Sequence, residues 1–184
     1  MGVTTLPAAA WRTAPGLRRI VAALGKDAVK VVGGAVRDTL LGHPVTDIDL
    51  ATPLLPQEVT KRLEEADIKV IPTGIVHGTV TAIASGDHHE ITTLRRDVET
   101  DGRRATIAFA EDWREDAARR DFTINALYAD PDSGDVDDWF GGIEDLAKGR
   151  VRFIGDAATR IAEDHLRILR FYRFAARFGH GDLE

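Results

Sequence analysis

The sequence predicts a mixed α/β domain, and two observations lead to that prediction. The 184 residues are 43% hydrophobic and 29% charged, a balance that suits one globular domain with a buried core and the start of a second. Short β-rich runs alternate with helical stretches, and no internal repeat or low-complexity tract interrupts them. We therefore expect a small mixed sheet flanked by helices.

Hydrophobic periodicity and turn residues place the individual elements. Helices are expected at 15–25, from near Ala35, from Pro56 to about Glu65, and as a helical pattern after Gly155-Asp156 that runs to Arg177. Strands are expected at 29–33, 46–51, 68–71, 77–84 and 88–94, the last two joined by a turn at 85–87. Residues 95–104 are polar and lack periodicity, so we expect an exposed, mobile loop there.

Composition narrows the classes of protein and of site. The absence of cysteine excludes disulfides, thiolate zinc sites and a cysteine nucleophile, and it is compatible with a cytoplasmic protein. No apolar run approaches the roughly 20 residues of a membrane-spanning helix, and residues 1–16 show no targeting signal. The net charge of −6 has the wrong sign for gripping nucleic acid by bulk electrostatics, so this chain alone should hold RNA weakly.

A pair of glycines follows the first predicted strand and precedes a helix. Gly33 and Gly34 would let backbone N–H groups approach a phosphate closely, and the start of the helix adds a favourable potential. Arg37, in the first turn of that helix, could add a charge-assisted contact to the same triphosphate. The alternative is a tight turn without a ligand.

Two aspartates occupy alternate positions of the next predicted strand. Asp47 and Asp49 should project from one face while Ile48 points to the core. Two carboxylates on one face repel each other unless a cation lies between them, and hard oxygen ligands suit Mg²⁺. Glu90, on a neighbouring strand, is the candidate for a third carboxylate. The alternative is a solvated strand end.

The order of these motifs resembles a known family. Gly33-Gly34-x-x-Arg37-Asp38 followed by Asp47-x-Asp49 is similar to the opening motif of CCA-adding enzymes and bacterial poly(A) polymerases. Residues 73–80 and 90–95 resemble the strand motifs that follow it in that family. The resemblance covers nearly the whole chain and implies a polymerase-β-like nucleotidyltransferase head.

Residues 119–127 give the most specific single match, because they resemble the family motif around the sugar of the incoming nucleotide. Arg120 could reach the triphosphate or the base, while Asp121 and Asn125 could bond the ribose hydroxyls. The alternative is that Asp121 caps the start of a helix ahead of an apolar run, and both roles can coexist.

Residues 138–152 resemble a hinge-like motif of the family, in which a glycine pair joins the sheet to the following helices. Trp139 stands where the family usually has proline, and it is expected to loosen that turn. The role we expect for this segment is structural.

The final predicted helix resembles the motif by which the family selects its nucleotide without a nucleic-acid template. Asp164 and Arg167 are three residues apart, so on one helix they would share a face and could pair with a base edge. Arg170 and Arg173 would turn progressively off that face toward phosphates. The alternative is a solvated ion pair on an ordinary amphipathic helix.

The resemblance implies attack of a tRNA 3′-hydroxyl on the α-phosphate of CTP or ATP, assisted by Mg²⁺, with release of pyrophosphate. It also implies a catalytic head over residues 1–154 and the start of a helical neck over 155–184. Family members continue through further regions that hold tRNA, so we expect a fragment of low activity. The sequence carries no indication of oligomeric state.

Three alternatives to full CCA addition remain open at this point. Poly(A) synthesis and partial addition, of only CC or only A, are compatible with the same motifs, and the polar stretch 95–104 favours full addition because such a loop accompanies the switch from C to A in the family. A non-catalytic module that senses nucleotides is the third, and the retention of both Asp47 and Asp49 argues against it.

Overall fold

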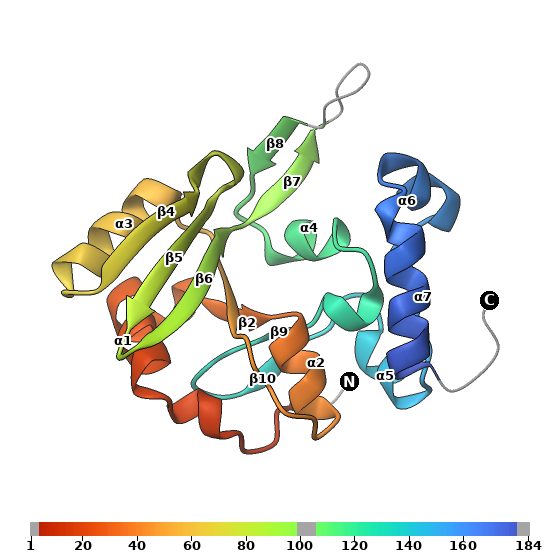
Figure 1. The fold of residues 1–184 in the computed structure, drawn as a ribbon, viewed down its shortest axis with the longest axis horizontal. Helices are drawn as coiled ribbons and strands as arrows, with labels where there is room; N and C mark the ends of the chain where they lie inside the picture. The colour runs from red at the N-terminus through yellow and green to blue at the C-terminus, as the bar shows by residue number, and fades with distance from the viewer. Residues whose placement is uncertain (1–3, 99–105, 180–184) are drawn as a thin grey trace.

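The computed structural model of the protein describes residues 4–98 and 106–179, and its main feature is one mixed sheet (Figure 1). The eight strands of this sheet run in the order β1-β10-β9-β2-β3-β6-β5-β4. Their bounds are Thr4–Thr5 (β1), Lys30–Val32 (β2), Asp49–Thr52 (β3), Lys69–Gly74 (β4), Thr79–Ala84 (β5), Asp87–Thr93 (β6), Tyr128–Ala129 (β9) and Asp135–Asp137 (β10). A separate antiparallel pair joins β7 (Arg95–Val98) to β8 (Thr106–Phe109). The predicted α/β class with a mixed sheet is confirmed.

The described helices flank this sheet, and two of them begin where the sequence predicts. Pro15 and Pro56 are the first residues of α1 and α3, where the missing N–H costs nothing and the fixed φ suits the helix. The α-helices are Pro15–Leu24 (α1), Gly34–Leu40 (α2), Pro56–Glu65 (α3), Trp113–Ala118 (α4), Gly142–Ala147 (α5), Ala157–Glu163 (α6) and Leu166–Phe178 (α7). The 3₁₀ segments are Ala10–Thr13 (η1), Lys26–Ala28 (η2), Ile75–His77 (η3) and Thr123–Asn125 (η4).

The two faces of the sheet differ in chemistry because side chains alternate along each strand. Val31, Leu50 and Ile91 face one side, where they join the buried apolar side chains of α1 and α3. Val32 and Tyr128 belong to a second cluster on the opposite side, above which α4 lies. The larger apolar cluster therefore lies on one face of the sheet, and a smaller one lies on the other face.

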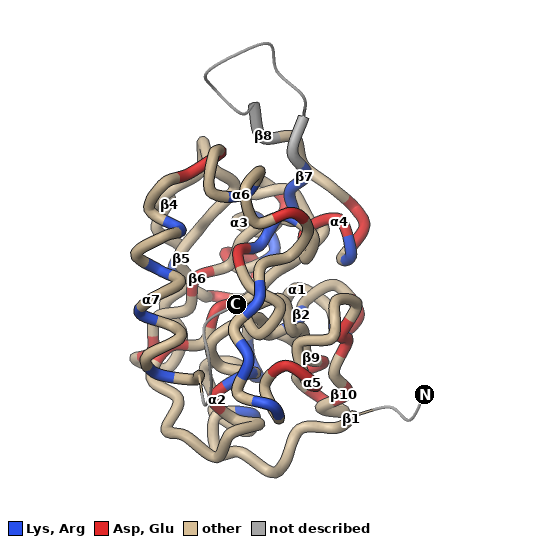
Figure 2. Tube along the Cα trace, turned by 90° about the vertical axis from the view of Figure 1, so that its right-hand side faces the viewer, with Lys and Arg blue, Asp and Glu red and all other residues tan. Residues whose placement is uncertain are grey.

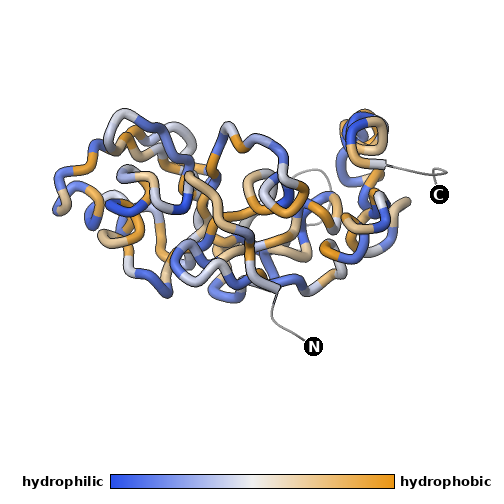
Figure 3. Tube along the Cα trace, turned by 90° about the horizontal axis from the view of Figure 1, so that it is seen from below, coloured by the Kyte–Doolittle hydropathy of each residue, from blue (hydrophilic) through white to orange (hydrophobic). Residues whose placement is uncertain are grey.

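The helix α7 docks on the rest of the chain through a group of aromatic rings. Phe122 is fully buried, and its ring centroid lies 4.9 Å from that of Phe153, 5.3 Å from that of Phe174 and 6.1 Å from that of Phe171. Viewed end-on in Figure 3, α7 carries both apolar and polar positions. Aromatic packing thus fixes where this helix lies, whereas the domain boundary after residue 154 stays a prediction.

Two sequence-based expectations about local structure are wrong. Residues 95–98 form β7 rather than a loop, because β8 supplies the hydrogen-bonding partner; the rest of the expected loop, 99–104, lies outside the described residues. The helical pattern that ends at Arg177 is two helices, since Asp164 has extended backbone angles and its carboxylate accepts the N–H of Leu166. Aspartate competes with helical backbone bonding in this way.

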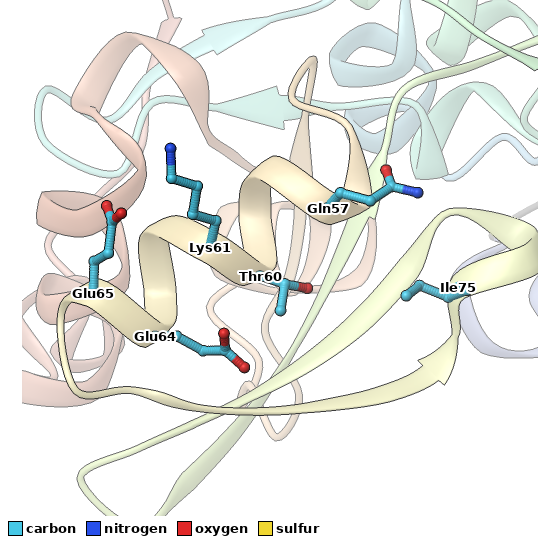
Figure 4. Close-up of a pocket in the computed structure, with 6 residues that line it drawn as sticks. All are labelled: Gln57, Thr60, Lys61, Glu64, Glu65 and Ile75. Carbon is cyan, nitrogen blue, oxygen red and sulfur yellow. The ribbon is translucent and has the colours of Figure 1, made fainter.

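A hollow lies between α3 and η3 (Figure 4). Its lining residues are Gln57, Thr60, Lys61, Glu64, Glu65 and Ile75. Over residues 4–98 and 106–179, the structure contains no helix with the length and apolarity needed to cross a membrane.

The second glycine of the hinge-like segment allows a close backbone contact. A Cβ added to Gly142 would lie 2.3 Å from the carbonyl oxygen of Thr123, and Asp138 holds the turn by accepting the N–H groups of Phe140, Gly142 and Ile143. The turn is therefore held by the Asp138 carboxylate beside Trp139.

We predict that Gly142→Ala lowers the free energy of unfolding by about 1–3 kcal/mol, because the methyl group overlaps backbone that cannot swing away. Denaturant unfolding measures this change. Gly74→Ala is the matched control, since its Cβ would meet only ordinary contacts at 3.4 Å or more. Equal stability of the two variants would contradict the assigned contact.

Candidate functional site

The polar face of the sheet brings two acidic side chains level with each other. Val32 pairs with both Asp49 and Tyr128, so these three residues face the same side. Leu50 pairs with Ile91 in the parallel β3–β6 ladder, which places Asp49 and Glu90 side by side, one residue earlier on each strand. Strand register thus brings Glu90 to the position expected of a further carboxylate.

The electrostatics of Asp49 favour a cation nearby. Burial raises the pKa of its carboxyl, Glu90 and Asp47 raise it further, and Arg120 opposes them. Asp47 itself is exposed, precedes β3 rather than lying in it, and accepts a hydrogen bond from Thr46 Oγ1 at 2.9 Å. The expectation that Asp47 and Asp49 share one strand is therefore wrong, because β3 begins at Asp49.

The donor set fits a hard divalent cation such as Mg²⁺, since carboxylate oxygens are the ligands such an ion prefers. Within the described residues, no three acidic or histidine side chains already converge as a metal cluster. Asp49 and Glu90 share one face. Burial raises the pKa of Asp49, and the like charges of Glu90 and Asp47 add to this effect, so a cation would relieve their repulsion.

The glycine turn between β2 and α2 adopts the conformation that only glycine adopts readily. Gly33 has φ 67° and ψ −116°, and its N–H donates to the carbonyl of Leu127 at 3.0 Å. A Cβ here would lie 3.3 Å from Nη1 of Arg120. This turn therefore lies next to a guanidinium group while the N–H of Gly33 is bonded within the protein, and contact of Gly33 and Gly34 with a phosphate stays a prediction.

Arg37 is buried, with 6% of its surface exposed, and its guanidinium group is held from several sides. Nε and Nη2 donate to the two carboxylate oxygens of Asp38 at 2.8 and 3.0 Å, and Nη1 donates to Asn125 Oδ1 at 2.6 Å. The group also lies 4.3 Å from the ring centroid of Phe178. Arg37 thus joins α2, η4 and α7, and contact with a triphosphate stays a prediction.

The segment 119–127 presents its polar groups to the same side as Arg37. Asp121 Oδ1 accepts the N–H of Phe122 at 2.8 Å and the side-chain amide of Asn125 at 3.0 Å, while Oδ2 accepts Nε of Arg170 at 2.7 Å. The η4 segment starts after Phe122 and has no side-chain cap, so Asp121 does not cap it. Asp121 instead links this segment to α7.

The residues expected to read the base come together in a different way from that predicted. Asp164 lies in the break before α7, so it does not share a helical face with Arg167. Arg167 Nη1 donates to the carbonyl of Arg160 at 2.7 Å and to Glu163 Oε2 at 2.5 Å. Asp164 and Arg167 nevertheless line one cavity.

This cavity, of about 690 Å³, collects nearly all the predicted nucleotide-binding residues. Its lining is Gly33, Gly34, Arg37, Asp49, Arg95, Arg119, Arg120, Asp121, Asn125, Asp164, Arg167, Arg170 and Phe174. Six arginines and three aspartates make this lining basic although the whole chain has a net charge of −6, and Figure 2 shows the basic residues that continue along α7. An adjoining cavity of about 280 Å³ adds Glu90 and shares Asp49 with the first.

Arg173 is the one predicted nucleotide-binding residue that does not line this cavity. It lines a neighbouring pocket with Arg177 and Phe178, and Arg37 and Phe174 lie between the two pockets. The three-residue step from Arg170 to Arg173 explains why the two side chains line different pockets, because each such step rotates the side chain around α7.

Sequence reasoning missed four residues at this site: Arg95, Asp116, Arg119 and Tyr128. Arg95 was placed in a loop, yet its Nη2 donates to Thr79 Oγ1 at 3.0 Å and it lines both cavities. Burial lowers the pKa of Arg95, and the charge of Arg119 adds to this effect. The pair of arginines at 119 and 120 was a signal in the sequence that could have identified Arg119. Asp116 and Tyr128 could be identified only from the tertiary structure.

Comparisons with known proteins identify relatives of this chain. The chain is 47% identical over 150 residues to CCA tRNA nucleotidyltransferase 1, mitochondrial, of Danio rerio, a match that covers 81% of this chain and 35% of that protein. It is 44% identical over 181 residues to the CCA-adding enzyme of Leuconostoc citreum, covering 97% and 43%. The chain thus spans less than half the length of these relatives.

A solved structure and a family model extend the comparison. The crystal structure of Bacillus stearothermophilus CCA-adding enzyme in complex with CTP superposes with a TM-score of 0.75 at 38% identity, covering 85% of this chain and 37% of that one. Residues 29–152, more than half of the chain, match the model described as the poly A polymerase head domain. The chain therefore belongs to the poly A polymerase head-domain family.

Proposed function

We propose that the chain is the nucleotide-transferring head of an enzyme that adds CMP and AMP, from CTP and ATP, to the 3′ end of tRNA. The observation that carries the proposal is one cavity lined by Asp49, several arginines and Asp164, next to a second one that contains Glu90. The relatives named as CCA-adding enzymes and CCA tRNA nucleotidyltransferases support the substrate class.

The predicted residues in and beside the two cavities have distinct proposed roles, and Asp47, which precedes β3, lines neither cavity. Asp47 and Asp49, with Glu90 as a third carboxylate, would hold Mg²⁺, which supplies charge neutralisation for phosphoryl transfer. Gly33, Gly34, Arg37, Arg120 and Arg170 would hold the triphosphate. Asp121 and Asn125 would bond the ribose, and Asp164 with Arg167 would pair with the base edge.

Poly(A) synthesis and partial CC or A addition use the same chemistry and are the alternatives. The names of the relatives favour CCA addition, whereas the family description names poly A polymerase. Cytoplasmic location stays a prediction, because the name of the Danio rerio relative includes the word mitochondrial.

We predict metal-dependent binding of CTP and ATP in preference to GTP and UTP. Calorimetric titration in Mg²⁺ measures it, and Asp47→Ala/Asp49→Ala should abolish the dependence on metal because the carboxylate oxygens are removed. Glu65→Ala is the matched control, since this exposed carboxylate lies on α3. Binding of ATP alone would favour poly(A) synthesis, and binding unaffected by the double substitution would contradict the proposed metal site.

We predict that Asp164→Ala reduces the preference for CTP and ATP while leaving metal-dependent triphosphate binding mostly intact. The reason is that the carboxylate would accept hydrogen bonds from the base edge, whereas the arginines would hold the phosphates. Titration of the variant with all four nucleotides tests this. If a folded variant lost all nucleotide affinity, Asp164 would not be a reader of the base.

We predict that Arg170→Ala weakens CTP binding about tenfold or more, the size expected for losing a hydrogen bond to a charged group. Arg173→Ala is the matched control on the same helix and should change affinity less than threefold or so, because its side chain lines the neighbouring pocket. Equal losses in the two variants would show that both pockets serve the nucleotide.

A further inference from the structure

Asp116 is a buried carboxylate that none of the roles above uses. It lies in the first turn of α4 with 5% of its surface exposed. Its Oδ1 accepts the backbone N–H of Arg95 at 2.9 Å, and its Oδ2 accepts the hydroxyl of Tyr128 and lies 3.5 Å from Nη2 of Arg120. One carboxylate therefore connects α4 to β7, to β9 and to an arginine of the nucleotide cavity.

The bonds around Asp116 close into a triangle. Arg120 Nε donates to the Tyr128 hydroxyl oxygen at 2.8 Å, and that hydroxyl donates to Asp116. Burial raises the pKa of Tyr128, which keeps the hydroxyl protonated and able to donate. Burial would lower the pKa of Arg120, but Tyr128 and Asp116 outweigh that effect and raise it. The triangle therefore depends on a charged guanidinium facing a charged carboxylate.

Without Asp116, the guanidinium group of Arg120 would have a competing partner. Asp49 lines the same two cavities, and the positive charge of Arg120 opposes the rise in the pKa of its carboxyl that burial and Glu90 cause. A released Arg120 would be drawn toward Asp49, where it would neutralise a carboxylate proposed to hold the cation. Asp116 lines the second cavity together with Asp49 and Glu90, and it keeps beside Arg120 an opposite charge that is already bonded to Tyr128 and to the backbone of Arg95.

The other oxygen of the Asp116 carboxylate, Oδ1, accepts the backbone N–H of Arg95, the first residue of β7. The Arg95 side chain lines both cavities, so the position of its backbone affects the shape of the site. Thr52 also holds this junction, since its carbonyl accepts the N–H of Leu94 at 2.8 Å. Asp116 is therefore the side-chain component of an anchor at the start of β7.

We propose that Asp116 is a positioning residue that orients Arg120 toward the nucleotide and fixes the start of β7 beside it. This inference rests on the proposed function, because Arg120 is useful there as a triphosphate ligand. A carboxylate suits both tasks, since one oxygen serves the backbone of Arg95 and the other serves Tyr128 and Arg120.

Two substitutions separate the two tasks. Asp116→Asn retains an oxygen that can accept the N–H of Arg95 but replaces the charged acceptor that faces Arg120. It should weaken CTP binding in Mg²⁺ about tenfold or more, while the Arg95 amide stays protected from hydrogen exchange. Asp116→Ala should weaken binding and also expose that amide. Glu115→Gln, on the exposed side of the same helix, is the matched control for the loss of one negative charge.

The measurements are calorimetric titration with CTP, nuclear magnetic resonance of the Arg95 amide and the Arg120 Nε–H in the free chain, and thermal unfolding. A loss of affinity in Asp116→Asn with faster exchange at Arg120 Nε–H and an unchanged Tm supports positioning. Wild-type affinity and exchange in that variant would overturn the inference. If the wild-type chain binds no CTP, the proposed function fails, and the exchange at Arg120 still decides whether Asp116 orients it.

Discussion

Repulsion among arginine side chains is the constraint on which this site depends. Six arginines line one cavity: Arg37, Arg95, Arg119, Arg120, Arg167 and Arg170. Like charges gathered around one cavity repel one another, and partial burial increases the free-energy cost of that repulsion. Burial lowers the pKa of Arg95, and the charge of Arg119 lowers it further. The rest of the site can be understood as the set of contacts that holds these groups in place.

Two of these groups are held by carboxylates, one on the adjacent residue and one on a distant segment. Asp38 pairs with Arg37, and Asp121 pairs with Arg170. Because each such carboxylate already has a partner within the protein, it balances the charge of the site, and of these two only Asp121 lines the cavity. The cavity stays basic on the side that faces a ligand, although the chain as a whole is acidic, and the net charge therefore says little about affinity for phosphates.

Aromatic packing completes the site by fixing α7. The Phe122 ring contacts the rings of Phe171 and Phe174, and the guanidinium group of Arg37 lies over Phe178. These contacts are apolar or cation–π interactions, so they position α7 without consuming the hydrogen-bond donors that would serve a nucleotide. The same helix contributes Arg167 and Arg170 to the cavity, which couples the fold of this segment to the chemistry of the site.

Local sequence determined the elements whose signals are short-range. Pro15 and Pro56 mark the starts of α1 and α3, and the alternation along β3 and β6 predicts which side of Leu50 and Ile91 meets the core. The strands β1 and β9 were missed because each has only two residues, which carry no measurable period. The break at Asp164 was missed because an aspartate in a helical pattern can either continue the helix or bond a nearby backbone N–H. The sequence does not distinguish these two cases.

The motifs at positions 33–49 and 119–127 predicted part of the set that lines the cavity, including Gly33, Arg37 and Arg120, whereas Asp47 lies outside it. Only the tertiary structure decided how they are held. The pairing of Glu90 with Asp49 follows from a parallel register between distant strands, and the link from Asp116 to Tyr128 and Arg120 follows from packing α4 on the sheet. Contacts of this kind join residues whose separation in the chain is unrelated to their separation in space, so no local pattern can encode them.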